Sequence, residues 1–169
     1  MPNYKYDAEL FLQDIETLFK AKLNTKIDEI NTEKNTNTPE TRDNFTLQTI
    51  GDDFWFLQQL PTIWNAKQFV IYGFQDLKLV GQQYDGAIQE MKVFIEVALP
   101  DRGDRRYKSD IYKNLRYTRA LQEVAMENYD SIRGYGKLTV DALTPTTIAV
   151  GDKVLRSSGV VITASISIR

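Results

Sequence analysis

Three charged residues between positions 85 and 92 form the first candidate for chemistry. Asp85 precedes Glu90 by five residues, and Lys92 lies two residues beyond Glu90. Residues two apart on a strand point to the same face, so Glu90 and Lys92 share a face of the strand predicted there. In Mg²⁺-dependent nucleases, carboxylates hold the metal and a lysine orients water, which is the activity this pattern would support. An exposed strand face with a cross-strand ion pair explains the same residues.

Asp52 and Asp53 form a second candidate, because adjacent carboxylates bind cations or act as acid and base. They precede an aromatic run, where a turn or a helix cap also accounts for them.

The chain contains no Cys and no His. This composition excludes thiol nucleophiles, thiolate metal sites, iron–sulfur clusters and Ser–His catalysis. Carboxylates, Lys, Tyr and Ser or Thr remain for any catalysis.

Positive charge gathers in residues 101–119. This stretch carries seven basic and three acidic side chains, a net charge of +4, whereas the rest of the chain carries 14 basic and 20 acidic, a net charge of −6. Such polarity indicates a subunit contact or a nucleic-acid contact, or else a solvated helix face. The acidic balance of the whole chain argues against a dedicated DNA-binding protein. The residues expected at a subunit interface are Arg102, Arg105, Arg106, Lys108, Arg116 and Arg119.

The elements that must position these residues begin with a helix. Hydrophobic residues recur every three or four positions from Leu10 to Ile30, which predicts an amphipathic helix over residues 7–31 with Asp7 as its N-cap. Residues 31–44 are rich in Asn and Thr, contain Pro39 and carry no apolar side chain. This segment is predicted to be a flexible loop.

From Phe45 onward the hydrophobic period becomes two, which predicts strands. Short strands are expected at 69–72 and 76–80, then a turn at 81–86 and a long strand at 88–99. One face of the long strand is wholly apolar and must be buried. Its members are Met91, Val93, Ile95, Val97 and Leu99.

The next predicted element is a second helix over residues 107–129, with glycines shortly after its end. Residues three and four apart predict which of its side chains face the core. The expected buried stripe comprises Ile111, Leu115, Thr118, Leu121 and Ala125.

Three strands are expected after this helix. A turn at 144–147 separates the first two, and Gly151-Asp152 is a two-residue hairpin turn before the last. The last strand alternates cleanly between apolar and polar residues. Its expected core residues are Val160, Ile162, Ala164, Ile166 and Ile168.

The predicted order is therefore helix, loop, three strands, helix and three strands. It indicates a single α+β domain over residues 1–169, with a mostly antiparallel sheet packed against two long helices. The longest apolar runs are far shorter than the roughly 20 residues that cross a bilayer. No membrane contact is expected.

The chain from Ile88 to its end resembles the tail terminator, or tail completion, proteins of tailed bacteriophages and related neck proteins. The likeness lies in a core strand that ends in a Pro-Asp-x-Gly turn, followed by a helix, a strand and a closing hairpin. These segments read FIEVALPDRGDRR, NLRYTRALQEVAMEN, KLTVDALTP and VLRSSGVVITASISIR. The last contains an Arg-x-x-Gly-Val element made by Arg156, Gly159 and Val160.

This resemblance implies a structural protein of the virion, without catalysis and without a cofactor. Proteins of this family form a hexameric ring on the last ring of the tail tube, stop its polymerisation and provide the surface that joins the head. The implied partners are further copies of the chain, the tail-tube protein and the neck or connector protein, with DNA passing through the ring. The implied location is the head–tail junction of a virion whose proteins are made in the host cytoplasm. A head-completion, neck or tail-tube subunit and the Mg²⁺-dependent nuclease stay open as alternatives.

Overall fold

The computed structural model describes residues 8–37, 45–58, 68–83, 86–100, 107–132, 137–150 and 153–168. Three helices, one 3₁₀ helix (η2) and five strands make up these ranges. In chain order they are α1 (Ala8–Asn37), η2 (Asp52–Phe54), β1 (Trp55–Leu57), β2 (Phe69–Gln83), β3 (Gly86–Pro100), α2 (Tyr107–Glu127), α3 (Tyr129–Ile132), β4 (Lys137–Val150) and β5 (Lys153–Ile168).

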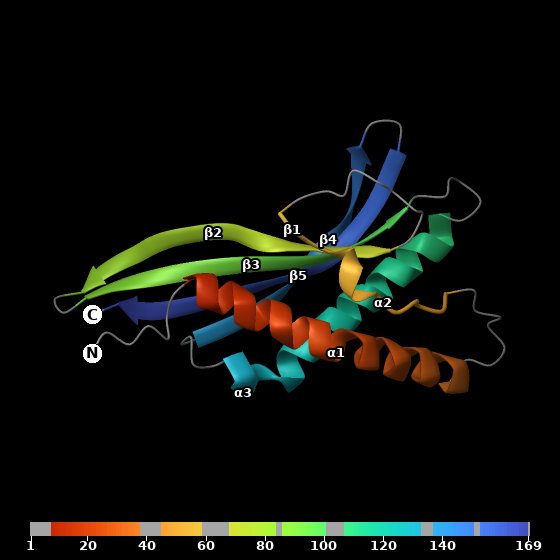
Figure 1. The fold of residues 1–169 in the computed structure, drawn as a ribbon, viewed down its shortest axis with the longest axis horizontal. Helices are drawn as coiled ribbons and strands as arrows, with labels where there is room; N and C mark the ends of the chain where they lie inside the picture. The colour runs from red at the N-terminus through yellow and green to blue at the C-terminus, as the bar shows by residue number, and fades with distance from the viewer. Residues whose placement is uncertain are drawn as a thin grey trace.

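The strands form one five-stranded sheet in the order β1-β2-β3-β5-β4 (Figure 1). β2, β3, β5 and β4 pair antiparallel, whereas the short β1 pairs parallel to β2. The predicted α+β class with two long helices is confirmed. The sheet is mixed, because β1 adds one parallel pairing to the four strands that pair antiparallel.

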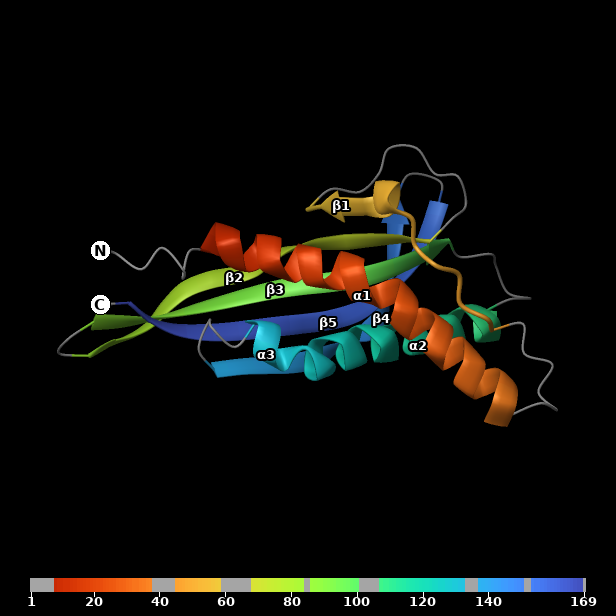
Figure 2. The same cartoon turned by 60° about the horizontal axis from the view of Figure 1, so that its bottom comes forward.

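Both long helices cover the same face of the sheet, as Figure 2 shows. The predicted apolar face of β3 is confirmed, since its five members are at most 7 % exposed and join the main hydrophobic core. Val160, Ile162 and Ala164 of β5 lie in the same core. A smaller apolar cluster lies on the helix-free face, and it comprises Phe69, Ile71, Ala98 and Leu155.

α1 is longer than the sequence predicted. It continues to Asn37, so the prediction of a loop from residue 31 is wrong for residues 31–37, and residues 38–44 lie outside the described ranges. Polar side chains in the last turns of α1 are held by hydrogen bonds and ion pairs. Thr32 donates to the carbonyl of Asp28 at 2.9 Å, and Glu33 pairs with Arg119. Hydrophobic periodicity does not register helix turns that are stabilised by polar contacts.

Two predicted short strands are one long strand. β2 runs unbroken from Phe69 to Gln83, with register shifts at Phe74/Asp76 and Leu79/Gly81. At the first shift, the residues that face the helices change from even-numbered (Tyr72, Phe74) to odd-numbered (Leu77), which interrupts the period of two in the sequence. The predicted turn at 81–86 is correspondingly shorter, because β2 ends at Gln83 and β3 begins at Gly86. Residues 45–51 form neither helix nor strand, and η2 and the short β1 follow them. The sequence did not predict β1 as a separate strand.

The turn predicted at 144–147 is also wrong. β4 continues through it, with a register shift against β5 between Leu143 and Thr146. Pro145 is accommodated there because β4 is an edge strand and a bulge needs no hydrogen bond from that residue. Two strands therefore follow α2 instead of three. The pairing of Val150 with Lys153 agrees with the predicted hairpin, although Gly151 and Asp152 lie outside the described residues.

The buried side of α2 is rotated from the predicted stripe. Thr118, Leu121 and Ala125 are buried as expected, but Leu115 is 47 % exposed and Ile111 is only half-buried. The predicted core position of these two residues is therefore wrong. Tyr117 and Asn114 are buried instead. The Tyr117 hydroxyl donates to the Gln48 carbonyl of the 45–51 segment, and the Asn114 backbone carbonyl accepts a hydrogen bond from Ser158 of β5.

Candidate functional site: the helix contact and the two sheet edges

Two of the six residues predicted at a subunit interface have side chains that the structure describes, and both contact this chain itself. Arg116 donates from Nη1 to the carbonyl of Phe45 at 3.0 Å, and its guanidinium lies 5.5 Å from the centre of the Phe45 ring. The Tyr112 ring is 5.1 Å from the same ring. Arg116 therefore holds the start of the 45–51 segment against α2.

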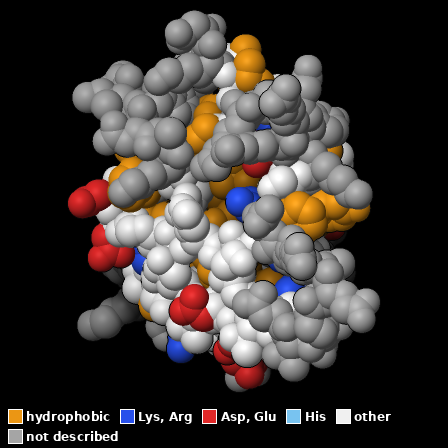
Figure 3. All heavy atoms as spheres, turned by 90° about the vertical axis from the view of Figure 1, so that its right-hand side faces the viewer, with side chains coloured by type: hydrophobic (Ala, Val, Ile, Leu, Met, Phe, Trp, Pro, Cys, Tyr) orange, Lys and Arg blue, Asp and Glu red, His pale blue; other side chains and the backbone are white. Residues whose placement is uncertain are grey.

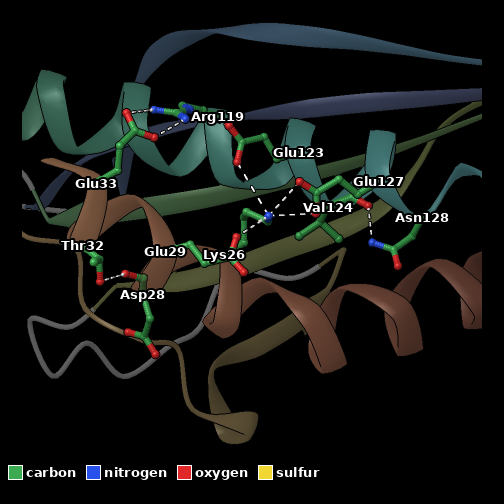
Figure 4. Close-up of polar contacts among 10 residues, drawn as sticks. All are labelled: Lys26, Asp28, Glu29, Thr32, Glu33, Arg119, Glu123, Val124, Glu127 and Asn128. Atoms are coloured by element: carbon green, nitrogen blue, oxygen red, sulfur yellow. Dashed lines mark hydrogen bonds and ion pairs between the residues drawn. The ribbon is translucent and has the colours of Figure 1, made fainter. Parts of the chain in front are cut away.

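Arg119 connects the two long helices. It binds Glu33 of α1 through two parallel hydrogen bonds of 2.9 and 2.6 Å, and its Nε donates to Glu123 at 2.6 Å (Figure 4). A planar guanidinium matches a carboxylate in this two-point geometry. The hydrogen bonds from Arg119 hold the pKa of Glu33 below its ordinary value. This part of the predicted basic surface thus stabilises the packing of α1 on α2.

Lys26 forms the second half of this contact. Its ammonium lies 2.8 Å from Glu127 and 2.5 Å from Glu29, and Glu123 is 3.9 Å away (Figure 4). The residue is only 8 % exposed, so most of its hydrocarbon chain is buried. Hydrogen bonds to Glu127 and then Glu29 raise the pKa of Lys26, outweighing the opposite effect of burial. The charged form is therefore the form that the fold stabilises.

The remaining members of the predicted interface are not described. Arg102, Arg105 and Arg106 lie outside the described residues, and Lys108 lies in α2 but its side chain is not described. At the end of the molecule where α1 ends and α2 begins, the described acidic and basic side chains are intermixed (Figure 3). The interface prediction for these residues stays a prediction.

The candidate nuclease residues lie on the helix-free face of the sheet. Glu90 forms ion pairs with Lys92 at 3.3 Å and with Lys78 of β2 at 3.6 Å. Lys78 also lies 3.3 Å from Asp76. Asp85 is outside the described residues. Where the structure describes the chain, Glu90 thus has two lysines beside it, which is the cross-strand ion pair expected of an exposed strand face.

Asp52 and Asp53 occupy the first turn of η2, and both are exposed. The turn is closed by a hydrogen bond from the Phe54 amide to the Gly51 carbonyl at 3.0 Å. Across the described ranges, no three Asp or Glu side chains come close enough to hold a metal ion together. The local role of the pair is to begin a 3₁₀ turn, where acidic side chains suit the positive end of the helix.

Three side chains that sequence reasoning missed fix the 45–51 segment. Asn24 and Asn31, two turns apart on α1, each make two hydrogen bonds of 2.8–2.9 Å to backbone groups, Asn24 to Ile50 and Asn31 to Leu47. The Tyr117 hydroxyl donates to the Gln48 carbonyl at 2.7 Å and accepts from the Gln48 amide at 3.0 Å. These amides and the hydroxyl replace a neighbouring strand. The seven-residue spacing of Asn24 and Asn31 was the only sequence signal.

A small hollow opens beside this segment. It has a volume of about 60 Å³, and Gln48, Gln68, Leu99, Asp110 and Tyr117 are among the residues that line it. This is room for a few water molecules. Asp110 is only 4 % exposed, so such water would hydrate its carboxylate.

The two sheet edges expose apolar side chains. At one edge, β2 has no strand partner beyond Tyr72 within the described residues, and Leu77 and Leu79 are 48 % and 65 % exposed. At the other edge, β4 pairs with β5 on one side only. α2 packs against β4 and β5 near this second edge. On the outward side of α2, Leu115 and Met126 are 47 % and 70 % exposed. Unpaired edges and exposed apolar residues are features of protein–protein contacts.

Comparison of the chain with the models of known protein families and with curated proteins finds no match. None of the helices in the described ranges combines the length and the apolar character that crossing a membrane requires.

Proposed function

We propose that this chain is a structural protein of a tailed-phage virion, which forms a ring of six subunits on the end of the tail tube. The ring would stop tube polymerisation and provide the surface that joins the head. The sequence resemblance over residues 88–169 supports the phage role. The ring itself is supported by the geometry of the sheet.

The observation that carries the ring is an open sheet with two different free edges and with both long helices on one face. A contact between unlike surfaces of identical subunits either closes into a ring or grows into a filament. β4 ends the strand order on one side. On the other side β2 is unpaired beyond Tyr72, where the short β1 no longer covers it, and this unpaired part is the β2 edge. The β2 edge and the β4 edge are unlike surfaces. A copy that docks its β2 edge at the β4 edge of the next copy leaves the same two edges free at the ends of the pair.

The same geometry would serve a neck, head-completion or tail-tube subunit, because those proteins also assemble as rings. The nuclease alternative finds less support, since the described neighbours of Glu90 are the lysines Lys78 and Lys92. The terminator role is favoured among the structural alternatives by the sequence resemblance.

The role is tested in the phage that encodes this chain. Gold-labelled antibody against the chain should mark the head–tail junction, and deletion of the gene should give tails of irregular length that do not join heads. Charge reversal at Arg105 and Arg106 should weaken assembly, because interfacial charge pairs reject the wrong sign. Tails of normal, fixed length attached to heads in the deletion phage would contradict the proposal.

A further inference from the structure

We infer that Leu77 and Leu79 of one copy pack against the outer stripe of α2 in the next copy. The outer stripe is defined by Leu115, Gln122 and Met126. This inference rests on the proposed ring and names the surfaces that build it. It follows from the orientation of α2, from the face on which the two leucines lie, and from the level of each along the sheet.

The orientation of α2 leaves apolar side chains outside and polar side chains inside. Leu115 and Met126 are largely exposed, whereas Asn114 is 0 % exposed. In the described part of the chain neither side-chain polar atom of Asn114 has a hydrogen-bond partner. A buried amide without partners destabilises a fold. A helix that buries Asn114 while exposing Leu115 indicates that the outer stripe is kept for a contact.

Leu77 and Leu79 lie on the same face of the sheet as α2. Leu77 pairs with Met91, which is fully buried beneath the helices, and Leu79 is two residues further along β2. Their exposure has a clear cause, because the β2–β3 hairpin extends beyond the first turn of α1 (Figures 1 and 2). These leucines therefore border a free strand edge on the helix side, where the described helices of their own copy leave them largely exposed.

The level of the leucines matches the end of α2. Across the sheet, Leu77 is aligned with Met91, then Ala164, then Leu138 near the start of β4. The end of α2 and α3 lie beside this start of β4 (Figure 2). When the β2 edge of a second copy joins the β4 edge with its helices on the same side, its two leucines come to the flank of α2 that carries Met126.

We assign a second copy of the chain as the partner of each surface. The two leucines and the outer stripe are both apolar, lie on the same side of the sheet and lie at the same position along the strands. Either surface alone is small beside the roughly 800 Å² that each partner of a stable interface buries. In a closed ring every copy makes the contact twice, once with each surface. Closure therefore stabilises the ring beyond the single contact of an open pair, so rings form at concentrations lower than those at which a pair held by one contact forms.

The test measures the native mass of the full chain by light scattering. Leu79→Asp and Met126→Asp should each reduce the mass from six copies to one at a concentration where the unaltered chain forms rings. Val154→Asp is the matched control, since Val154 is 40 % exposed but ten residues from Ala164 along β5, about 33 Å away. Its rings should persist. Circular dichroism checks folding, and Leu79→Ser and Met126→Ser replace any Asp variant that does not fold.

Mixing the two variants makes the test specific. Leu79→Asp retains an intact outer stripe and Met126→Asp retains intact leucines, so an equal mixture at high concentration should form dimers through one contact and no rings. Variants that keep six-fold rings would overturn this contact and leave the ring proposal standing. A mixture that stays monomeric would also overturn it. An unaltered chain that is monomeric at every concentration and does not bind tail ends would overturn the ring and this contact together.

Discussion

Removing one oxygen atom from Tyr117 tests how the 45–51 segment is held. The hydroxyl makes two short hydrogen bonds to the backbone of Gln48, and Tyr117 is 1 % exposed. Tyr117→Phe keeps the ring but leaves the Gln48 amide and carbonyl without this partner. At a net 0.5–1.5 kcal/mol for each hydrogen bond, the expected loss in the free energy of unfolding is about 1–3 kcal/mol.

Urea unfolding measures this loss, and the slope with denaturant should stay unchanged because the folded surface is the same. Hydrogen exchange at the Gln48 amide should accelerate, since its acceptor is gone. Gln48→Ala is the matched control, because the bonds use the backbone of Gln48 and not its exposed side chain, and it should change stability by less than about 0.5 kcal/mol. A Tyr117→Phe loss below about 0.5 kcal/mol with unchanged exchange would refute the assigned role of the hydroxyl.

Three further predictions follow from the core, from Glu16 and from the helix-free face. Ile162→Ala should lower the free energy of unfolding, measured with urea, by about 2–5 kcal/mol because the side chain is fully buried. A loss below about 1 kcal/mol would mean that the Ile162 side chain does not point into the core. Burial alone would raise the pKa of Glu16, but hydrogen bonds from Lys20 and Tyr72 hold it below its ordinary value of 4.5. The stabilisation by ionised Glu16 is therefore present above pH 4.5 and lost as the pH falls below it, and Glu16→Gln should flatten this part of a stability–pH profile. Glu90→Ala combined with Lys92→Ala should leave folding and native mass unchanged, and the unaltered chain should cut no DNA with Mg²⁺; cleavage abolished by Glu90→Gln would favour the nuclease instead.

Strand faces were predictable from the sequence because a period of two has few competing explanations. The alternation from Met91 to Leu99 is uninterrupted, and the structure buries every predicted member. The helix faces were less predictable. In α2, Leu115 fits the apolar stripe as well as any residue, but the Tyr117 hydroxyl bonds to Gln48 and Ser158 donates to the backbone carbonyl of Asn114, and these contacts hold the helix in another rotation. Hydrophobic periodicity carries no information on such polar contacts.

Contacts between distant segments account for the rest of what the sequence did not reveal. The last turns of α1 are stabilised by Glu33 pairing with Arg119, 86 positions away. Asn24 and Asn31 look like ordinary polar positions of a helix until the 45–51 segment lies beside them. Charge clustering at 101–119 led to the prediction that Arg116 and Arg119 lie at a subunit interface. Their observed partners are in the same chain, which local sequence could not distinguish from a neighbouring subunit.

The central claim is that this chain assembles head to tail into a closed ring. Native mass spectrometry of the purified full chain, with electron microscopy of the same sample, tests it most directly. We expect a single species at six times the 19.5 kDa mass of one chain, seen as closed rings with six-fold symmetry. A chain that remains a monomer at every concentration, or that forms only two-fold symmetric dimers, would contradict it.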